Sequence, residues 1–382
     1  MSPEARDTAR ATTAAATPPA PPAEQILAAW LVWRSGRRGS VADLSENAID
    51  WMATVALAAR DFALPMLATV LDDAGVRSRI PADVASYLDY ALAANADGNA
   101  AIRTEALAIG HALDAAGVTG VVLKGAAWLF EAGPASGDRM MRDIDLLVAS
   151  DDLDTAMRSL ALAGFLPSGT IGTEQAHIHE WPLEHAGHPV SVEVHTALST
   201  RTRMLSGADM LAEAVPVAPG LAIPSPRHRI LHNVIHGEIV NGNRAGGIID
   251  LREAMDLGRL MQASAATLDW TVLAREAGER GMGPALAGGL HKAAFVSACP
   301  PPEPFAQDAR GRRHLRRCLI QRRWPPLDRA LRPLANLSRG LAWERDAFSL
   351  GLGDRRDVGA RLKVNRRRIT RAWTGLGRLL RG

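Results

Sequence analysis

Apolar positions recur at helical spacing over most of the first 117 residues. Between residues 44 and 59 they return every three or four positions, and residues 62–71 continue the same apolar face. Pro81 stands where the first turn of a helix accepts proline, and Gly117 closes a last helical stretch. The pattern therefore predicts a helical region before any strand.

The periodicity changes after Gly117. Three short segments, rich in β-branched residues or alternating in polarity, predict strands at residues 118–123, 143–148 and 189–195. Helical segments separate the strands, and helical spacing returns from Arg227 onward. Strands and helices in this order predict an α+β or α/β core.

The chain is predicted to divide into five regions. The first residues are rich in Ala, Thr and Pro, and such a composition cannot bury enough apolar surface to fold. We expect a disordered lead at residues 1–24, a helical N-terminal region at 25–117, a strand-containing core at 118–200, a helical C-terminal region at 201–300 and a basic amphipathic helical tail at 301–382.

Charge is distributed unevenly along the 382 residues. The net charge is only +3, but residues 301–382 carry 21 basic and 7 acidic side chains. The first 300 residues carry 23 basic and 34 acidic ones. The sequence therefore joins an acidic body to a basic tail.

The basic tail suggests several partners. Arg310–Arg323 is arginine-rich, and Lys363–Arg381 places apolar residues on one helical face and most arginines elsewhere. One interpretation is that the tail folds back on the acidic body, and another is that it binds an acidic protein or peptide. The sequence favours neither interpretation over the other. Anionic lipid comes next, and nucleic acid comes last because stacking aromatic residues are sparse.

The sequence also limits the compartment. No uncharged apolar run approaches the ~20 residues of a membrane-spanning helix. Residues 1–23 lack the apolar core of a secretory signal. Cys299 and Cys318 match no zinc spacing and suit a reducing compartment, so we expect a cytoplasmic protein.

Candidate chemistry is concentrated on two of the predicted strands. Asp143 and Asp145 alternate with Ile144, so both carboxylates face the same side and repel each other. A divalent metal such as Mg²⁺ is the natural cation between them. On the third strand Glu193 and His195 share one face. If the strands are neighbours, Glu193 completes a three-carboxylate cluster able to hold two metals.

A glycine turn precedes the aspartates. Gly125 stands where a strand ends and a helix begins, a place where the backbone approaches phosphates closely. Lys124 can neutralise triphosphate charge, or it is a solvated lysine at the end of a strand. Arg139 and Arg142 either bind phosphate or the acceptor, or form salt bridges with the aspartates.

Histidines form two further candidate groups. The segment with His177, His179, Glu180, His185 and His188 has no cysteine and no common zinc spacing, so a polar loop near the active site is favoured. A second group, His232 and His236, is one helical turn apart. The pair forms either an active-site wall or a core or interface pair.

At these residues the sequence resembles the nucleotidyltransferase superfamily, which includes DNA polymerase β and the aminoglycoside nucleotidyltransferases. It is most similar to an uncharacterised bacterial nucleotidyltransferase family with an LKG turn and an R-x-x-x-D-I-D-L-L-V strand. The likeness runs from about Ile49 to Asp256 and includes Val192–His195 and Leu231–His236. It implies a nucleotidyltransferase-like mixed β-sheet core flanked by helices.

The resemblance also implies roles for individual residues. Asp143 and Asp145 match the metal-binding pair, Glu193 matches the third carboxylate, a metal ligand or base, and Gly125 matches the phosphate-binding turn. Ala126 stands where many superfamily members have serine, so phosphate contacts must come from backbone N–H groups or from Lys124.

The expected function is a metal-dependent nucleotidyltransferase. It would use Mg²⁺ or Mn²⁺ to move a nucleoside monophosphate from a nucleoside triphosphate, such as ATP, to a hydroxyl, amine or phosphate acceptor, on a small molecule or a peptide, and would release pyrophosphate. The alternative is an inactive adaptor with the same fold that recruits a partner through its basic tail. A third reading is a phosphohydrolase that uses the same carboxylates.

Overall fold

The structure is a computed structural model, and it describes residues 26–31, 49–131, 137–167, 182–186, 190–199, 202, 204–329 and 331. The predicted lead, the predicted helix at Lys363–Arg381 and four residues of the histidine-rich segment lie outside the described residues; those four are His177, His179, Glu180 and His188.

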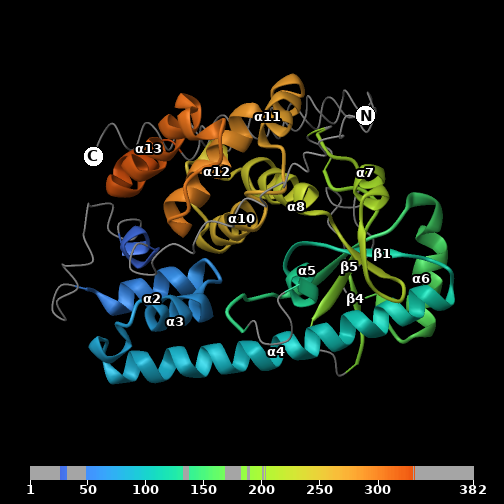
Figure 1. The fold of residues 1–382 in the computed structure, drawn as a ribbon. Helices are drawn as coiled ribbons and strands as arrows, with labels where there is room; N and C mark the ends of the chain where they lie inside the picture. The colour runs from blue at the N-terminus through green and yellow to red at the C-terminus, as the bar shows by residue number, and fades with distance from the viewer. Residues whose placement is uncertain are drawn as a thin grey trace, which may run out of the picture.

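A mixed seven-stranded sheet lies at one end of the molecule (Figure 1). Its strands are β1 (Gly120–Val122), β2 (Asp143–Leu147), β3 (Leu166–Pro167), β4 (Leu183–Glu184), β5 (Ser191–His195), β6 (Val215–Ala218) and β7 (Leu221–Ile223). Their order is β3-β4-β5-β2-β1-β7-β6. The central strand β2 is antiparallel to β1 and parallel to β5. The α+β class with a mixed sheet is therefore confirmed.

Helices precede, surround and follow the sheet. On the N-terminal side these are α2 (Trp51–Arg60), α3 (Leu64–Asp73), η2 (Arg77–Arg79) and α4 (Ala82–Ala115). Among the strands they are α5 (Lys124–Glu131), η3 (Ser150–Asp152), α6 (Leu153–Leu162) and α7 (Gly207–Ala212). The C-terminal set is α8 (Pro226–Val234), the π-helix η4 (Ile235–Val240), α9 (Asn243–Gly246), α10 (Leu251–Ala263), α11 (Trp270–Glu279), α12 (Gly283–Ser297), η5 (Phe305–Gln307) and α13 (Ala309–Arg323).

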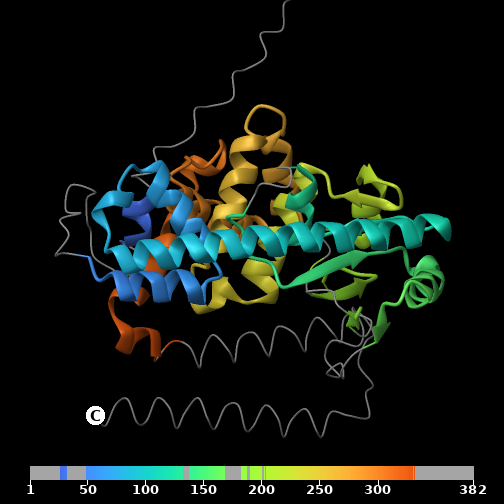
Figure 2. The ribbon, with the colours of Figure 1, turned by 90° about the horizontal axis from the view of Figure 1, so that it is seen from below.

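The long helix α4 connects the N-terminal helices to the sheet. It runs beneath both and spans most of the molecule in Figures 1 and 2. Near its start, Val84 and Leu88 pack in the core of α2 and α3. Further along, Ile102 and Ile109 pack with the strands in a second core. The 34 residues of α4 thus hold the two parts at a fixed separation.

The two faces of the sheet carry different cores. Ile144 of β2 packs in the core that includes α4 and α6, whereas Leu147 packs with Ile230 and Leu231 of α8. Since strand residues alternate in direction, Asp143 and Asp145 share the face of Leu147. The carboxylates therefore lie on the side of the sheet that the C-terminal helices cover.

The sheet also takes strands from beyond residue 200. β6 and β7 join its edge next to β1, although we expected the region from residue 201 to be helical. Propensity in this stretch is weak because Pro216, Pro219 and Gly220 interrupt it, and the strand pairing is set by contact with β1. The predicted domain boundaries themselves stay predictions.

The first part of the basic tail forms a helix packed on the body. One face of α13 is buried: Gly311 and His314 lie against α12, and Gln321 donates a hydrogen bond to the carbonyl oxygen of Gly246. A Cβ at Gly311 would overlap His291 of α12, so the two helices approach closely. Within the described residues, no helix combines the length and apolar character needed to cross a membrane.

Candidate active site

Carboxylates from β2 and β5 gather on one face of the sheet. The register of these parallel neighbours pairs Asp145 with Glu193 and places Asp143 opposite Ser191. Register partners on adjacent strands project to the same face, so the expected adjacency of the two strands is confirmed. Asp145 is buried, while Asp143 and Glu193 are half-buried. The group is therefore open to a ligand on the side of Asp143 and Glu193.

Lys124 places a positive charge among these carboxylates. Its Nζ donates a hydrogen bond to Oδ1 of Asp145 at 2.7 Å. The residue has φ of 47°, a left-handed conformation that side chains with a Cβ rarely adopt and that is often found at functional sites. Burial lowers the pKa of Lys124, but the neighbouring carboxylates, Asp145 foremost, outweigh burial and raise it. The ammonium therefore stays charged.

The two aspartates differ in how their charge is compensated. Burial, followed by the charge of Asp145, raises the pKa of Asp143. Burial acts in the same direction on Asp145, but Lys124 and His195 outweigh it and lower the pKa of Asp145. Asp145 is thus a permanent anion, whereas Asp143 gains most from an additional cation.

His195 belongs to the same cluster. Its Nε2 lies 2.8 Å from Oδ1 of Asp145 and 3.9 Å from Oε2 of Glu193. Ligand atoms of Asp145, Glu193 and His195 all lie within 4.8 Å of one another, close enough to hold one metal ion. The two carboxylates are suitable donors for Mg²⁺ or Mn²⁺, whereas the imidazole is a donor that Zn²⁺ and other transition metals prefer. From the sequence, His195 was expected to share a strand face with Glu193, but it was not among the predicted site residues.

The glycine turn is packed from behind by an arginine. A Cβ at Gly125 would overlap Nη1 of Arg139 and lie 2.7 Å from Cγ of Met141. Glycine is therefore required here because the guanidinium lies against the turn. Ala126 follows, fully buried in the first turn of α5.

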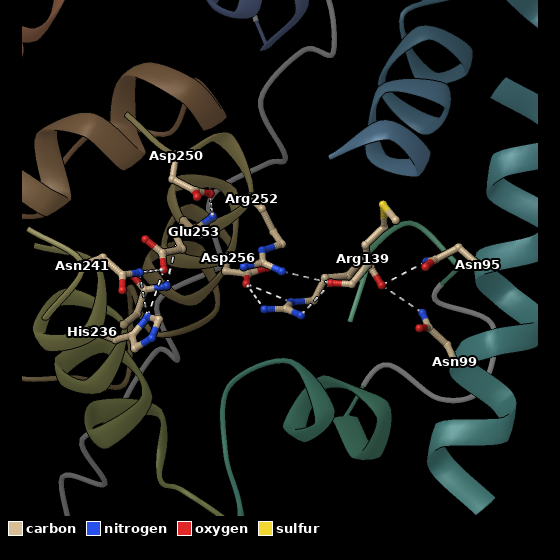
Figure 3. Close-up of polar contacts among 11 residues, drawn as sticks. Asn95, Asn99, Arg139, His236, Asn241, Asp250, Arg252, Glu253 and Asp256 are labelled. Carbon is tan, nitrogen blue, oxygen red and sulfur yellow. Dashed lines mark hydrogen bonds and ion pairs between the residues drawn. The ribbon is translucent and has the colours of Figure 1, made fainter. Parts of the chain in front are cut away.

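Arg139 is buried and fully engaged with other residues. Its Nε and Nη2 bind Oδ2 of Asp256 on α10 at 2.9 and 2.8 Å. Its carbonyl oxygen accepts hydrogen bonds from Asn95 and Asn99 of α4, each at 3.0 Å. Figure 3 shows Arg139 between these asparagines and Asp256. The residue links α4 to α10 directly behind the turn.

Arg142 lies beside a second arginine on an aromatic ring. Its guanidinium stands over Phe62 at 4.0 Å from the ring centroid, and that of Arg252 lies 5.2 Å from the same centroid. Phe62 has φ of 52°, a second left-handed residue near the site. Cation–π contacts of this kind fix both guanidinium groups without neutralising them. Two arginines therefore share one aromatic ring, and the charge of Arg252 acts to lower the pKa of Asp143.

A cavity opens between the sheet and the C-terminal helices, beside Lys124. It is lined by Lys124, Trp128, Arg139, Pro224, Arg229, His232, Asn233, His236, Arg252, Glu253, Asp256 and Leu260. Arg229 stands over Trp128 at 4.1 Å and forms an ion pair with Glu131. His232 and His236 thus line the same cavity as Lys124, and a role for them in an active site stays a prediction. Of the histidine-rich loop, His185 lies against Phe165, with ring centroids 5.0 Å apart.

Comparison with known proteins identifies one family. A family described as "Uncharacterised nucleotidyltransferase" matches residues 47–296. No curated protein and no solved structure matches the chain. The matched range contains every residue of the cluster and cavity described above.

Proposed function

The chain belongs to this family of nucleotidyltransferases, enzymes that transfer phosphorus-containing groups, and from that premise we propose a specific reaction. The enzyme moves a nucleoside monophosphate from a nucleoside triphosphate to a hydroxyl, amine or phosphate acceptor and releases pyrophosphate. The observation that carries the proposal is the convergence of Asp143, Asp145 and Glu193 on one lysine.

The donor set fits a divalent cation. Three carboxylates face a single ammonium, so the cluster keeps negative charge for a metal ion to neutralise. Asp143, Asp145 and Glu193 would hold Mg²⁺ or Mn²⁺. The imidazole of His195 lies beside Asp145 and Glu193. Bound there, the cation would supply charge stabilisation during phosphoryl displacement.

The remaining site residues bind the nucleotide or position the residues that bind it. Lys124 binds the triphosphate, and the backbone of Gly125 and Ala126 approaches it at the start of α5. The guanidinium of Arg142 lies on Phe62 and has no ion pair among the described residues, and this supports a role in contacting phosphate. For Arg139, whose guanidinium is committed to Asp256, we propose a positioning role behind the turn. A cytoplasmic location and an acidic partner for the basic tail remain proposals from the sequence.

The test is nucleotidyl transfer with labelled nucleotides. Incubation with labelled ATP, GTP, CTP and UTP and Mg²⁺ or Mn²⁺ should release pyrophosphate, and Asp143→Ala/Asp145→Ala should abolish the release. The matched control is Asp151→Ala/Asp154→Ala, which removes two exposed carboxylates just beyond β2. Free phosphate without pyrophosphate would indicate a hydrolase. Inactivity with all four nucleotides and no metal-dependent nucleotide binding would indicate the adaptor.

A further inference from the structure

A second polar cluster faces the cavity opposite Lys124. His236 and Glu253 line this cavity together with Lys124, and they come from η4 and α10. Because Lys124 donates a hydrogen bond to Asp145, one wall of the cavity is in direct contact with the carboxylate cluster of the sheet. A molecule in the cavity would therefore lie between His236 and the proposed site of transfer.

The carboxylate of Glu253 is held firmly in place. Its Oε1 accepts hydrogen bonds from Nδ2 of Asn241 at 3.1 Å and from Nδ1 of His236 at 3.0 Å. Its Oε2 accepts from Nδ2 of Asn243 at 3.1 Å. Figure 3 shows His236, Asn241 and Glu253 gathered at this point. Burial raises the pKa of Glu253, but His236 and nearby cations outweigh burial and lower it. Glu253 is therefore a fixed anion.

The fixed carboxylate determines the tautomer of His236. A carboxylate can only accept, so Nδ1 carries the proton and Nε2 is left with its lone pair. The π-helix brings the backbone close enough for this contact, since a Cβ at Gly237 would lie 2.6 Å from Oε2 of Glu253. π-Helical turns are frequent at functional sites.

His232 lies one turn earlier and differs in its surroundings. It is buried, and burial together with Lys124 lowers its pKa to about 3. Within the described part of the chain it has no carboxylate partner comparable to Glu253. Only His236 of the pair combines exposure to the cavity with a carboxylate that can stabilise an imidazolium.

We propose that His236, oriented by Glu253, is the general base that activates the acceptor for nucleotidyl transfer. The inference rests on the proposed function and replaces Glu193 as the base. Nε2 takes the proton from the acceptor O–H or N–H while the acceptor atom bonds to the α-phosphorus. The bond from that phosphorus to the bridging oxygen breaks, and its electron pair leaves with pyrophosphate. The imidazolium then returns its proton to water.

The test uses the full chain, ATP with Mn²⁺, and water as the acceptor present in every assay. His236→Ala should lower kcat for pyrophosphate release by about 100-fold, the lower range for loss of a general base. The KM for ATP should change by less than about twofold, because the base does not bind the triphosphate. Added imidazole should restore part of the activity of this variant.

Two further variants separate catalysis from folding. Glu253→Gln keeps the side-chain shape and should lower kcat about tenfold at unchanged KM, because the imidazolium loses its counterion. His228→Ala is the matched control, since His228 lies on the preceding helix α8, pairs with Glu213 and does not line the cavity. It should retain wild-type kcat and show no response to imidazole.

The outcomes distinguish the two proposals. If wild type releases pyrophosphate and His236→Ala does so at the same kcat, the general base is wrong while nucleotidyl transfer stands. The general base is also wrong, and nucleotidyl transfer again stands, if His236→Ala and His228→Ala lose activity equally and imidazole restores the activity of neither. If wild type releases no pyrophosphate and binds no nucleotide with Mn²⁺, the proposed function itself fails.

Discussion

The molecule contains two buried lysine–carboxylate clusters that differ in charge balance and access. Lys124 and Lys292 are the only lysines among the first 300 residues, and each binds a buried carboxylate. Lys292 of α12 forms an ion pair with Glu238 and donates to the carbonyl of Ile248 at 2.9 Å. His314 of α13 lies 3.6 Å from the same carboxylate.

The Lys292–Glu238 pair is enclosed. The side chains of Lys292 and Glu238 are 4% and 6% exposed, and one ammonium meets one carboxylate. In the Lys124 cluster the lysine is 27% exposed and Glu193 is 31% exposed, and three carboxylates share one ammonium. Surplus charge together with an opening to solvent marks a site that binds a ligand, whereas balance and enclosure mark a structural pair.

The largest expected effect comes from removing the buried anion of the open cluster. Asp145→Asn should lower pyrophosphate release by at least about 10³-fold, because the amide keeps the shape but cannot hold a cation. The midpoint of thermal unfolding should fall less than in Lys292→Met, because Asp143 and Glu193 still face Lys124. Parallel activity and unfolding assays check both. Loss of stability as great as in Lys292→Met would remove the distinction between the clusters.

The closed cluster should show the opposite pattern. Lys292→Met leaves Glu238 buried without its ammonium and should lower the free energy of unfolding by roughly 3 kcal/mol. Lys292→Met/Glu238→Gln should recover much of that loss because no unpaired charge remains. Denaturant titration measures the stabilities, and ATP affinity of the folded variants should match wild type. A variant that is fully stable but no longer binds ATP would contradict the structural role.

The sequence predicted the open cluster because its residues follow strand alternation. Asp143 and Asp145 occur two positions apart within an apolar strand, and Glu193 repeats this pattern on the next parallel strand. Short, periodic segments specify which residues share a face before any long-range contact is known. The strands, an α+β or α/β core and the shared face of these carboxylates could therefore be predicted from the local pattern, whereas the mixed sheet flanked by helices was implied by the family resemblance.

The remaining contacts have no such local signal. Arg139 meets Asp256 across 117 residues, and His236 meets Glu253 across 17 residues on a different helix. Nothing in helical periodicity indicates that η4 widens into a π-helix or which carboxylate lies behind His236. The side chain that excludes a Cβ at Gly125 is that of Arg139, which comes from a separate segment and has no signal in the local pattern.

The ammonium of the open cluster should act on substrate more than on stability. Lys124→Met should raise the KM for ATP about 10- to 100-fold, since one phosphate contact is lost. Mn²⁺ should bind the variant more tightly, because Oδ1 of Asp145 is released from its competing partner. Isothermal titration with Mn²⁺ and steady-state kinetics measure the two effects. An unchanged KM together with weaker Mn²⁺ binding would show that Lys124 only maintains the carboxylates.

The smallest effect tests a carboxyl group beside the Lys292 cluster. Asp250 lines a small cavity with Glu238, Glu253 and Lys292, and its side chain caps the N-terminus of α10. Burial, followed by the charge of Glu253, raises the pKa of Asp250 to about 7. In the unfolded chain an aspartate has a pKa of about 3.9. The folded state therefore favours the neutral carboxyl.

The sign of the pH dependence follows from that difference. The contribution of Asp250 to stability is complete below about pH 4 and is lost as the pH rises through about 7. Asp250→Asn keeps the cap and cannot ionise, so it should match wild type at pH 4 and exceed it by roughly 1–2 kcal/mol at pH 8. Chemical unfolding at both pH values measures this difference. The control Asp269→Asn changes the exposed cap of α11 and should give no gain at pH 8. An equal gain from both variants would show that the effect comes from helix capping. It would then not come from ionisation of the buried carboxyl group of Asp250.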